Sequence, residues 1–129
     1  MLHMSHEHVA AMNDILRNSD AVREACRSLP AARTWSYQLT DGPDGHDVDW
    51  TVRFADTVEF SLGRPNGRAD VVFTGDWARM MRSTKAAREG HHIDSGATIT
   101  GDEAVVAETQ AVLEIARGVA TLPVEFPDC

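Results

Sequence analysis

The stretch VDWTVRFADTVEFSL, residues 48–62, decides the fold class. Large apolar side chains stand at every second position from Val48 to Phe54, and polar side chains fill the positions between them. The same alternation returns in residues 57–62, after a short corner. A period of two places the apolar side chains of a strand on one face and the polar ones on the other. We therefore expect two strands joined by a turn, with one face buried and one face toward water.

Two further strands flank this pair in the sequence. Upstream, residues 34–39 alternate, with Trp35, Tyr37 and Leu39 on the apolar side. Downstream, Pro65-Asn-Gly67 is a strong turn signal, and the apolar residues of 69–73 follow it at every second position. Four consecutive strands with short connections predict an antiparallel meander.

Helical patterns precede and follow these strands. Residues 6–29 carry apolar side chains at three- and four-residue spacing, with an interruption at Asn18-Ser-Asp20 and a stop at Pro30. Thr74-Gly-Asp76 ends the fourth strand and opens a helix, because glycine relieves the turn and aspartate caps the helix. The polar residues 83–92 are expected to form a helical turn and a loop that ends at Gly90.

The last third repeats the strand-to-helix transition. Residues 93–100 are expected to form a fifth strand, and Thr100-Gly-Asp102 opens a last helix that Gly118 should end. The apolar, proline-broken residues 119–129 should lie extended over the domain. The predicted order is helix, four strands, helix, strand, helix. This is an α+β fold with a five-stranded, mostly antiparallel sheet in one domain, residues 1–129, with helices covering one face.

Composition excludes several classes of protein. A net charge of −8, with no run of basic residues, argues against nucleic acid and against an anionic membrane surface. No apolar run is long enough to span a bilayer, and the first residues lack the features of a signal peptide. Cys26 and Cys129 are far apart in the sequence and are expected to be free thiols in a reducing compartment. We expect a cytoplasmic protein without stable membrane insertion.

The segment Ser95-Gly-Ala-Thr-Ile-Thr-Gly-Asp102, followed by an amphipathic helix, resembles the small-x-hydrophobic strand ending in Gly-Asp of sterol carrier protein type 2 domains. The strands in 50–62 and the Ala69-Asp-Val-Val-Phe-Thr74 strand, followed by a helix with Trp77, also look like this family. The resemblance extends over about residues 33–117, and the order of the elements contributes most to it.

The resemblance implies an apolar tunnel between the sheet and the helices, which would hold a fatty acyl or sterol-like ligand by non-covalent binding. By position, the tunnel wall would be formed by Trp50, Val52, Phe54, Phe60 and Phe73 of the sheet, and by Trp77, Met80, Met81, Val105, Val112 and Leu113 of the helices. The residues by themselves leave two interpretations open. Such side chains line large apolar pockets, and they also pack ordinary cores.

Other functions stay open as alternatives. No nucleophile, nucleotide-binding or metalloprotease motif is present, so an enzyme or accessory protein for an apolar acyl, terpenoid or polyketide intermediate would rely on His91, His92 and Asp94 as candidate acid–base groups. The third alternative is an interaction module with a filled core, whose apolar tail docks a partner or a second copy in a homodimer.

Metal binding is not expected, and neither is any other cofactor. His3, His6 and His8 have the close spacing that suits Zn²⁺ or Ni²⁺, but we expect this terminus to fray, and no cysteine accompanies them. The aspartates of residues 41–49 do not have the spacing of a calcium-binding loop.

Overall fold

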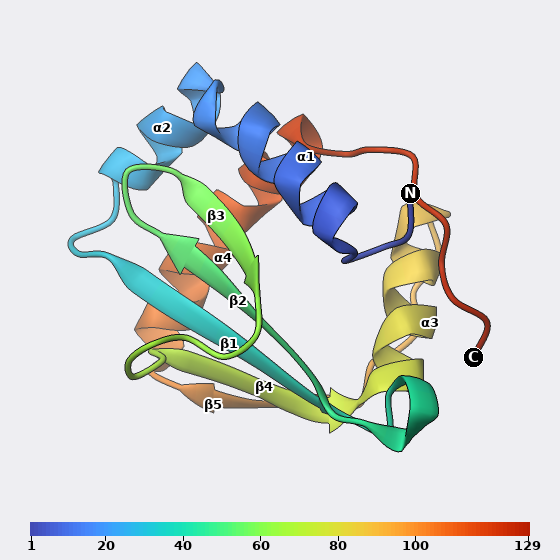
Figure 1. Ribbon diagram of the computed structural model, residues 1–129. Coiled ribbons are helices and arrows are strands. Elements are labelled where there is room, and N and C mark those ends of the chain that lie inside the picture. Colours follow the sequence, from blue (N-terminus) through green and yellow to red (C-terminus); the bar gives the residue numbers. More distant parts are fainter.

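The computed structural model describes residues 1–129, and it consists of a five-stranded sheet with the α-helices gathered on one side (Figure 1). In chain order the elements are α1 (His6–Arg17), α2 (Asp20–Arg27), β1 (Arg33–Thr40), the short 3₁₀ turn η1 (Pro43–Gly45), β2 (Val48–Phe54), β3 (Val58–Leu62), β4 (Val71–Asp76), α3 (Trp77–Arg88), β5 (Thr98–Gly101) and α4 (Glu103–Val119). The predicted α+β fold and its order of elements are confirmed, with the leading helix in two pieces.

Every α-helix has a side chain that caps its N-terminus. In each case a serine hydroxyl or an aspartate carboxylate accepts a hydrogen bond from a backbone N–H of the first turn. The caps are Ser5, Ser19, Asp76 and Asp102. A cap of this kind stabilises a helix by about 1 kcal/mol. The two Thr-Gly-Asp segments therefore act as predicted, because the aspartate of each caps the helix that follows.

The order of the strands in the sheet is β3-β2-β1-β4-β5. Three neighbouring pairs are antiparallel, and β1 and β4 are parallel. The expectation of a four-stranded meander is therefore wrong at its last step, since β4 lies beside β1 and not beside β3. Two hydrogen bonds fix the start of β4 to β1. The Asp70 N–H donates to the Thr34 carbonyl, and the Thr34 N–H donates to the Asp70 carboxylate, each at 2.8 Å.

Several boundaries differ from the expected ones. The fifth strand is shorter than residues 93–100, because Gly96 has a positive φ of 67° and its N–H bonds to the Asp94 side chain in a turn. The helix α4 continues through Gly118 to Val119. Ala120, which follows α4, is buried, and this packing outweighs the cost of about 1 kcal/mol that glycine brings to a helix.

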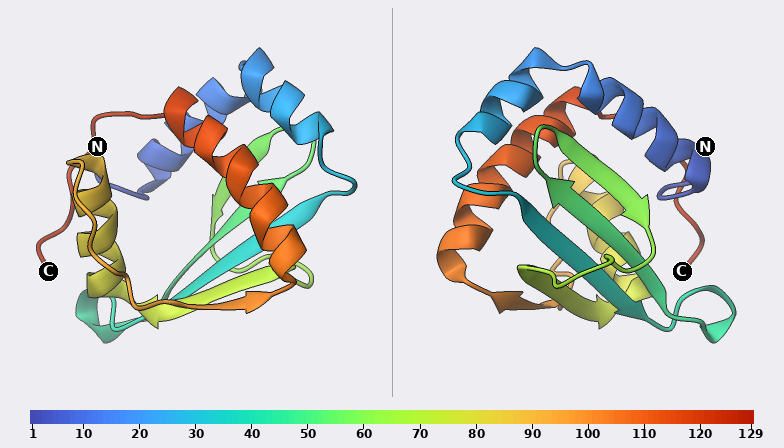
Figure 2. Two further views of the ribbon diagram at one scale, coloured as in Figure 1. Left: turned by 180° about the vertical axis from the view of Figure 1, so that it is seen from behind. Right: turned by 60° about the vertical axis from the view of Figure 1, so that its left-hand side comes forward.

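The two faces of the sheet have different surroundings (Figure 2). The helices lie over the inner face, which carries the aromatic residues, and the outer face carries mainly polar side chains. The two chain termini lie near each other, beside α3. None of the helices combines the length and the apolar character that crossing a bilayer requires.

Candidate functional site

All eleven residues of the predicted tunnel wall belong to one apolar cluster between the sheet and the helices or pack against it. Seven are buried: Trp50, Val52, Phe54, Phe73, Met81, Val112 and Leu113. Four are only partly buried: Phe60, Trp77, Met80 and Val105. The structure thus brings the predicted residues together, and the buried majority pack as core.

Aromatic rings form the centre of this cluster. Tyr37 lies between two rings, with its ring centroid 4.5 Å from that of Phe73 and 5.0 Å from that of Trp50. Trp35 extends the group, with its ring centroid 4.9 Å from that of Phe73 and 5.1 Å from that of Phe54. Burial raises the pKa of the Tyr37 phenol, so this ring stays neutral at physiological pH. The central part of the inner face is therefore filled by packed side chains.

Two polar contacts hold α4 over this aromatic group. The Trp35 indole N–H donates to the Thr109 hydroxyl at 2.9 Å, and that hydroxyl donates to the Val105 carbonyl of the preceding turn at 2.6 Å. At the start of β1, the Arg33 guanidinium forms an ion pair of 2.8 Å with Glu108. These contacts fix one helix relative to one strand.

The inner layer is closed at the β3 edge of the sheet. The Asn13 side chain of α1 accepts a hydrogen bond from the Phe60 N–H and donates one to the Phe60 carbonyl, both at 2.8 Å. It therefore pairs with the free edge of β3 as a neighbouring strand would. The Thr57 hydroxyl donates to the Leu16 carbonyl at 3.1 Å, which joins the end of α1 to the β2–β3 corner.

The opposite edge of the inner face is uncovered. Ile99 of β5 stands directly across from Phe73 of β4, so both side chains point to the inner face. Phe73 is buried, whereas Ile99 is 53% exposed. The helices α3 and α4 begin at opposite ends of the β4–β5 pair, because α3 follows β4 and α4 follows β5 in an antiparallel pair. Three of the four partly buried residues, Trp77, Met80 and Val105, lie in the first turns of these helices.

The first residues are not frayed, in contrast to the expectation. The His3 N–H donates to the Glu125 carbonyl at 2.8 Å, and the Glu125 N–H donates to the Met1 carbonyl at 2.9 Å. Residues 1–3 thus pair with the C-terminal tail. We call residues 1–3 and residues 122–126, which pair in this way, the terminal clasp. Tertiary pairing with the tail supplies the order that a terminal segment lacks by itself.

Side chains reinforce the terminal clasp. The His3 ring stacks on Phe126, with 4.7 Å between centroids, and its centroid lies 5.3 Å from that of His8. The Arg88 guanidinium of α3 lies 5.8 Å from the Phe126 centroid and donates to the Leu122 carbonyl at 2.7 Å. Burial, with smaller effects of His8 and Arg88, lowers the pKa of His3 to about 4. Burial also lowers the pKa of His8, and the positive charges of Arg88 and the N-terminal amine lower it further.

The hydrogen bonds of His8 bear on metal binding. The Met4 N–H donates to His8 Nδ1 at 2.9 Å, so this nitrogen is the acceptor of a neutral ring and Nε2 carries the proton. Neither His8 Nε2 nor His3 Nδ1, both buried, has a hydrogen-bond partner. Since His8 Nε2 has no free lone pair in this form, a metal ion there would have to break the Met4 bond. No three His, Cys, Asp or Glu side chains are gathered as a metal site.

The candidate acid–base residues His91, His92 and Asp94 all lie exposed in the loop between α3 and β5. The Asp94 carboxylate accepts a hydrogen bond from the Gly96 N–H at 2.9 Å, and neither imidazole has a side-chain partner. The loop does not assemble the three residues into one hydrogen-bonded group.

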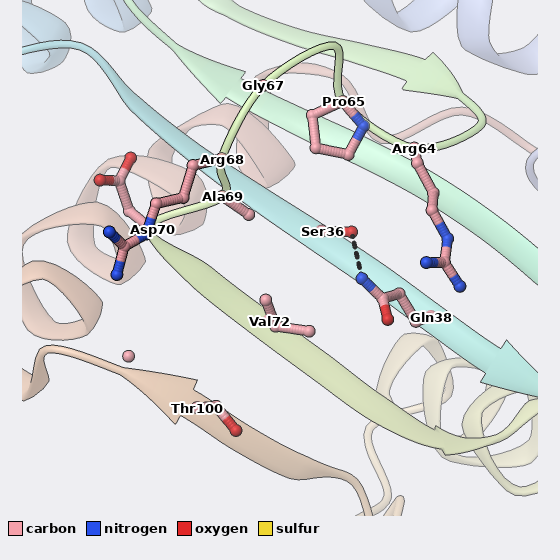
Figure 3. Close-up of a pocket in the computed structure, with 11 residues that line it drawn as sticks. Ser36, Gln38, Arg64, Pro65, Gly67, Arg68, Ala69, Asp70, Val72 and Thr100 are labelled. Carbon is pink, nitrogen blue, oxygen red and sulfur yellow. Dashed lines mark hydrogen bonds between the residues drawn. The ribbon is translucent and has the colours of Figure 1, made fainter.

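A hollow of about 460 Å³ lies on the outer face, away from the predicted site (Figure 3). The residues 64–70, which connect β3 to β4, arch over it, and β1, β4 and β5 form its floor. Ser36, Gln38, Val72 and Thr100 line the floor, and Arg64 and Arg68 stand at opposite ends. The Gln38 amide donates to the Ser36 hydroxyl at 3.2 Å.

Sequence reasoning missed this hollow and also the anchoring role of Thr109. Ser36 and Gln38 occupy the polar positions of an alternating strand, which indicated a solvated face, yet Ser36 is buried. The one feature of the sequence that could have indicated a polar site here is the pair of arginines, Arg64 and Arg68, on either side of the turn at Pro65-Asn-Gly67.

No family model and no curated protein matches this sequence. Solved structures do match. A conserved hypothetical protein of Thermus thermophilus is 18% identical over 95% of this chain and 93% of its own, with a TM-score of 0.59. A sterol carrier protein 2 is 17% identical over 89% and 97%, with a TM-score of 0.55. A ubiquinone synthesis protein, UbiJ, is 20% identical over 85% and 88%, with a TM-score of 0.51.

These likenesses extend over most of the chain, and they confirm the predicted resemblance at the level of the fold. The chain has the fold of sterol carrier protein 2. At such low identity the likeness concerns the fold, and function has to be argued from the site itself.

Proposed function

We propose that this protein binds a hydrophobic small molecule non-covalently at the uncovered β5 end of its inner face. One observation carries the proposal, namely that Ile99 is 53% exposed on the face that the core occupies elsewhere. Partly buried Trp77, Met80 and Val105 are the candidates to contact the ligand beside it. The neighbouring sterol carrier protein 2 structures favour a lipid. The ligand class that we propose is a fatty acyl chain or a sterol-like molecule.

Binding would rest on the burial of apolar surface. Each methylene that leaves water contributes roughly 0.8 kcal/mol, so an acyl chain gains affinity from its length without any specific polar contact. The methionines at this end suit such a ligand, because a flexible thioether side chain adapts to varied shapes. The seven buried residues of the predicted wall would form the packed core behind the site. The partly buried residues would make the direct contacts with the ligand.

The tail that follows α4 is the candidate gate. Leu122 packs against the edge of the core cluster, while the tail is held by the terminal clasp and by Arg88. Release of these contacts would free the tail without unfolding a strand or a helix. Residues 83–92 are a second candidate gate. They are helical as far as Arg88, which leaves only their last part as a loop.

A displacement titration with a fluorescent fatty acid tests the proposal. Ile99→Gln should weaken binding by about tenfold, because it replaces one apolar contact side chain by a polar one. Ile115→Gln is the matched control, since Ile115 is also exposed, at 44%, but lies on α4 away from the buried stripe. Equal affinity of the two variants, or no binding by the parent protein, would contradict the proposal.

A second candidate function is suggested by the likeness to UbiJ, which is described as a ubiquinone synthesis protein. In this version the same inner-face site presents an apolar terpenoid, acyl or polyketide intermediate to an enzyme or acts on it. Turnover that disappears in His91→Ala or His92→Ala would favour catalysis, and binding that is unchanged in these variants would favour a carrier.

The exposed β5 edge also allows a protein partner, such as a second copy of the chain. Mass that increases with concentration, in the absence of any lipid binding, would support that alternative. A cytoplasmic location is part of the proposal, and it suits the two free thiols, buried Cys26 and exposed Cys129.

A further inference from the structure

The segment that arches over the outer hollow is fixed at both of its ends. At its start, the Thr51 hydroxyl donates to the Gly63 carbonyl at 2.8 Å. At its end, Asp70 exchanges two hydrogen bonds of 2.8 Å with the backbone of Thr34. Between these points it crosses the outer face from β3 to β4 and stands off the sheet (Figure 3). The hollow is therefore a consequence of the parallel β1–β4 pairing.

The floor of the hollow is polar and lined by small or medium side chains. Of the eleven lining residues only two are hydrophobic, and none is aromatic. Hydroxyl groups of Ser36 and Thr100 and the amide of Gln38 are the polar side chains of the floor. Its volume of about 460 Å³ is in the range of sites for small molecules, about 300–1,000 Å³. An acyl chain would find little apolar surface here.

The hollow is lined by more basic than acidic side chains, although the protein as a whole is acidic. Two arginines and one aspartate line it, in a chain with a net charge of −8. The Asp70 carboxylate already accepts a hydrogen bond from the Thr34 N–H. The Arg64 guanidinium forms an ion pair with the Asp49 carboxylate, with 3.4 Å between Nε and Oδ2. Arg68 takes part in none of the five ion pairs of the protein, and its side chain donates no hydrogen bond. Its five N–H donors are available to a ligand.

We propose that this outer hollow binds a small phosphorylated molecule whose body carries hydroxyl groups, that is, a sugar phosphate. A guanidinium group binds a phosphate through two parallel hydrogen bonds, and Arg68 has the free donors for this. Hydroxyl groups of the ligand would pair with Gln38 and Thr100, while buried Ser36 positions the Gln38 amide by accepting its hydrogen bond. A nucleotide fits less well, because no aromatic ring is present to stack on its base. This site lies on the opposite face of the sheet from the apolar site and does not depend on it.

Titration of the ¹⁵N-labelled protein with glucose 6-phosphate, followed by amide NMR signals, tests the proposal. We expect shifts at Gly67, Gly101 and the Gln38 side chain, and a dissociation constant that rises at least about tenfold in Arg68→Gln. Arg82→Gln, an exposed arginine on α3 in the other layer, should bind as the parent does. Unchanged amide signals outside the hollow would show that each variant is folded.

Three parallel titrations define the class of ligand. Glucose alone should not bind, and inorganic phosphate should bind more weakly than glucose 6-phosphate. Tighter binding of AMP, or equal binding of inorganic phosphate, would overturn the assignment to sugar phosphates. No shift in the hollow at about 10 mM ligand, or equal affinity of the Arg68→Gln and Arg82→Gln proteins, would overturn the site itself.

Discussion

The two edges of the sheet differ in how their inner side is covered. At β3, α1 lies along the strand, Asn13 pairs with the Phe60 backbone, and Val58 is fully buried. At β5, no side chain pairs with the strand backbone as Asn13 does at β3. Ile99 is exposed there, although it stands opposite the buried Phe73. The inner layer is thus closed along Val58 and Phe60, with only Leu62 at the end of β3 exposed, whereas at β5 it leaves Ile99 in water. Under the proposed function, a ligand would therefore enter at β5, where it would not have to disrupt the packed core.

The largest effect should come from the closed end. Phe54→Ala removes a fully buried ring beside Trp35, and we expect a loss of about 3–5 kcal/mol in the free energy of unfolding. Urea denaturation followed by circular dichroism measures it. Leu62→Ala is the control, since Leu62 is exposed on the same face. A loss below about 1 kcal/mol for Phe54→Ala would mean that this end is not a closed core.

Acidification should loosen the terminal clasp, which holds the start of α1. The folded pKa of His3, about 4, lies below its ordinary value of 6.5, so folding releases a proton. The stability from this group is complete above pH 6.5, and it is lost as the pH falls from 6.5 toward 4. From the shift of pKa we expect a loss of about 2–3 kcal/mol between pH 7 and pH 4.5.

Denaturation of the parent and of His3→Gln at both pH values isolates this contribution. The variant should lose less stability on acidification, because glutamine does not titrate. His6→Gln is the matched control, since His6 is exposed. An identical dependence on pH in the parent and the His3→Gln protein would exclude His3 as the sensitive group.

Asn13→Ala should open the β3 edge. It removes both hydrogen bonds to Phe60 and leaves the backbone groups of the edge without a partner, so a loss of about 1–3 kcal/mol is expected. Hydrogen exchange of the Phe60 amide should accelerate in the same variant. Asn18→Ala is the control, because its amide bonds only within the exposed end of α1. A protected Phe60 amide in Asn13→Ala would contradict the strand-like pairing.

The smallest effect on stability is expected at the open end. Ile99→Ala should change the free energy of unfolding by no more than about 0.5 kcal/mol, since the side chain is half exposed before any ligand binds. A loss as large as that of Asn13→Ala, measured in urea, would show that Ile99 packs as core and would remove the contrast between the two edges.

The sequence predicted the faces of the sheet better than the neighbours of its strands. Alternation identified Trp50, Val52 and Phe54 as inward residues, because the period of a strand is a local property. The pairing of β4 with β1 was not predictable in this way. It depends on a segment that crosses the outer face and on the contacts of Asp70 with Thr34, which are distant in sequence.

The sequence also predicted the members of the candidate site better than their degree of burial. All eleven expected residues lie in or against one cluster, but the sequence did not separate buried Phe54 from partly buried Met80. That separation depends on where α3 and α4 leave the sheet, which no local pattern encodes. The order of the N-terminal residues was missed for a similar reason, because His3 and Phe126 come from opposite ends of the chain.

The most direct test of the central claim is an NMR measurement of intermolecular NOEs between unlabelled palmitate and the methyl groups of the ¹³C-labelled protein. We expect NOEs from the acyl chain to Ile99 and Met80, at the open end, and none to Val22 or Val58, which are fully buried at the closed end. NOEs to Val58 but not to Ile99, or no NOE to any methyl group, would contradict this claim.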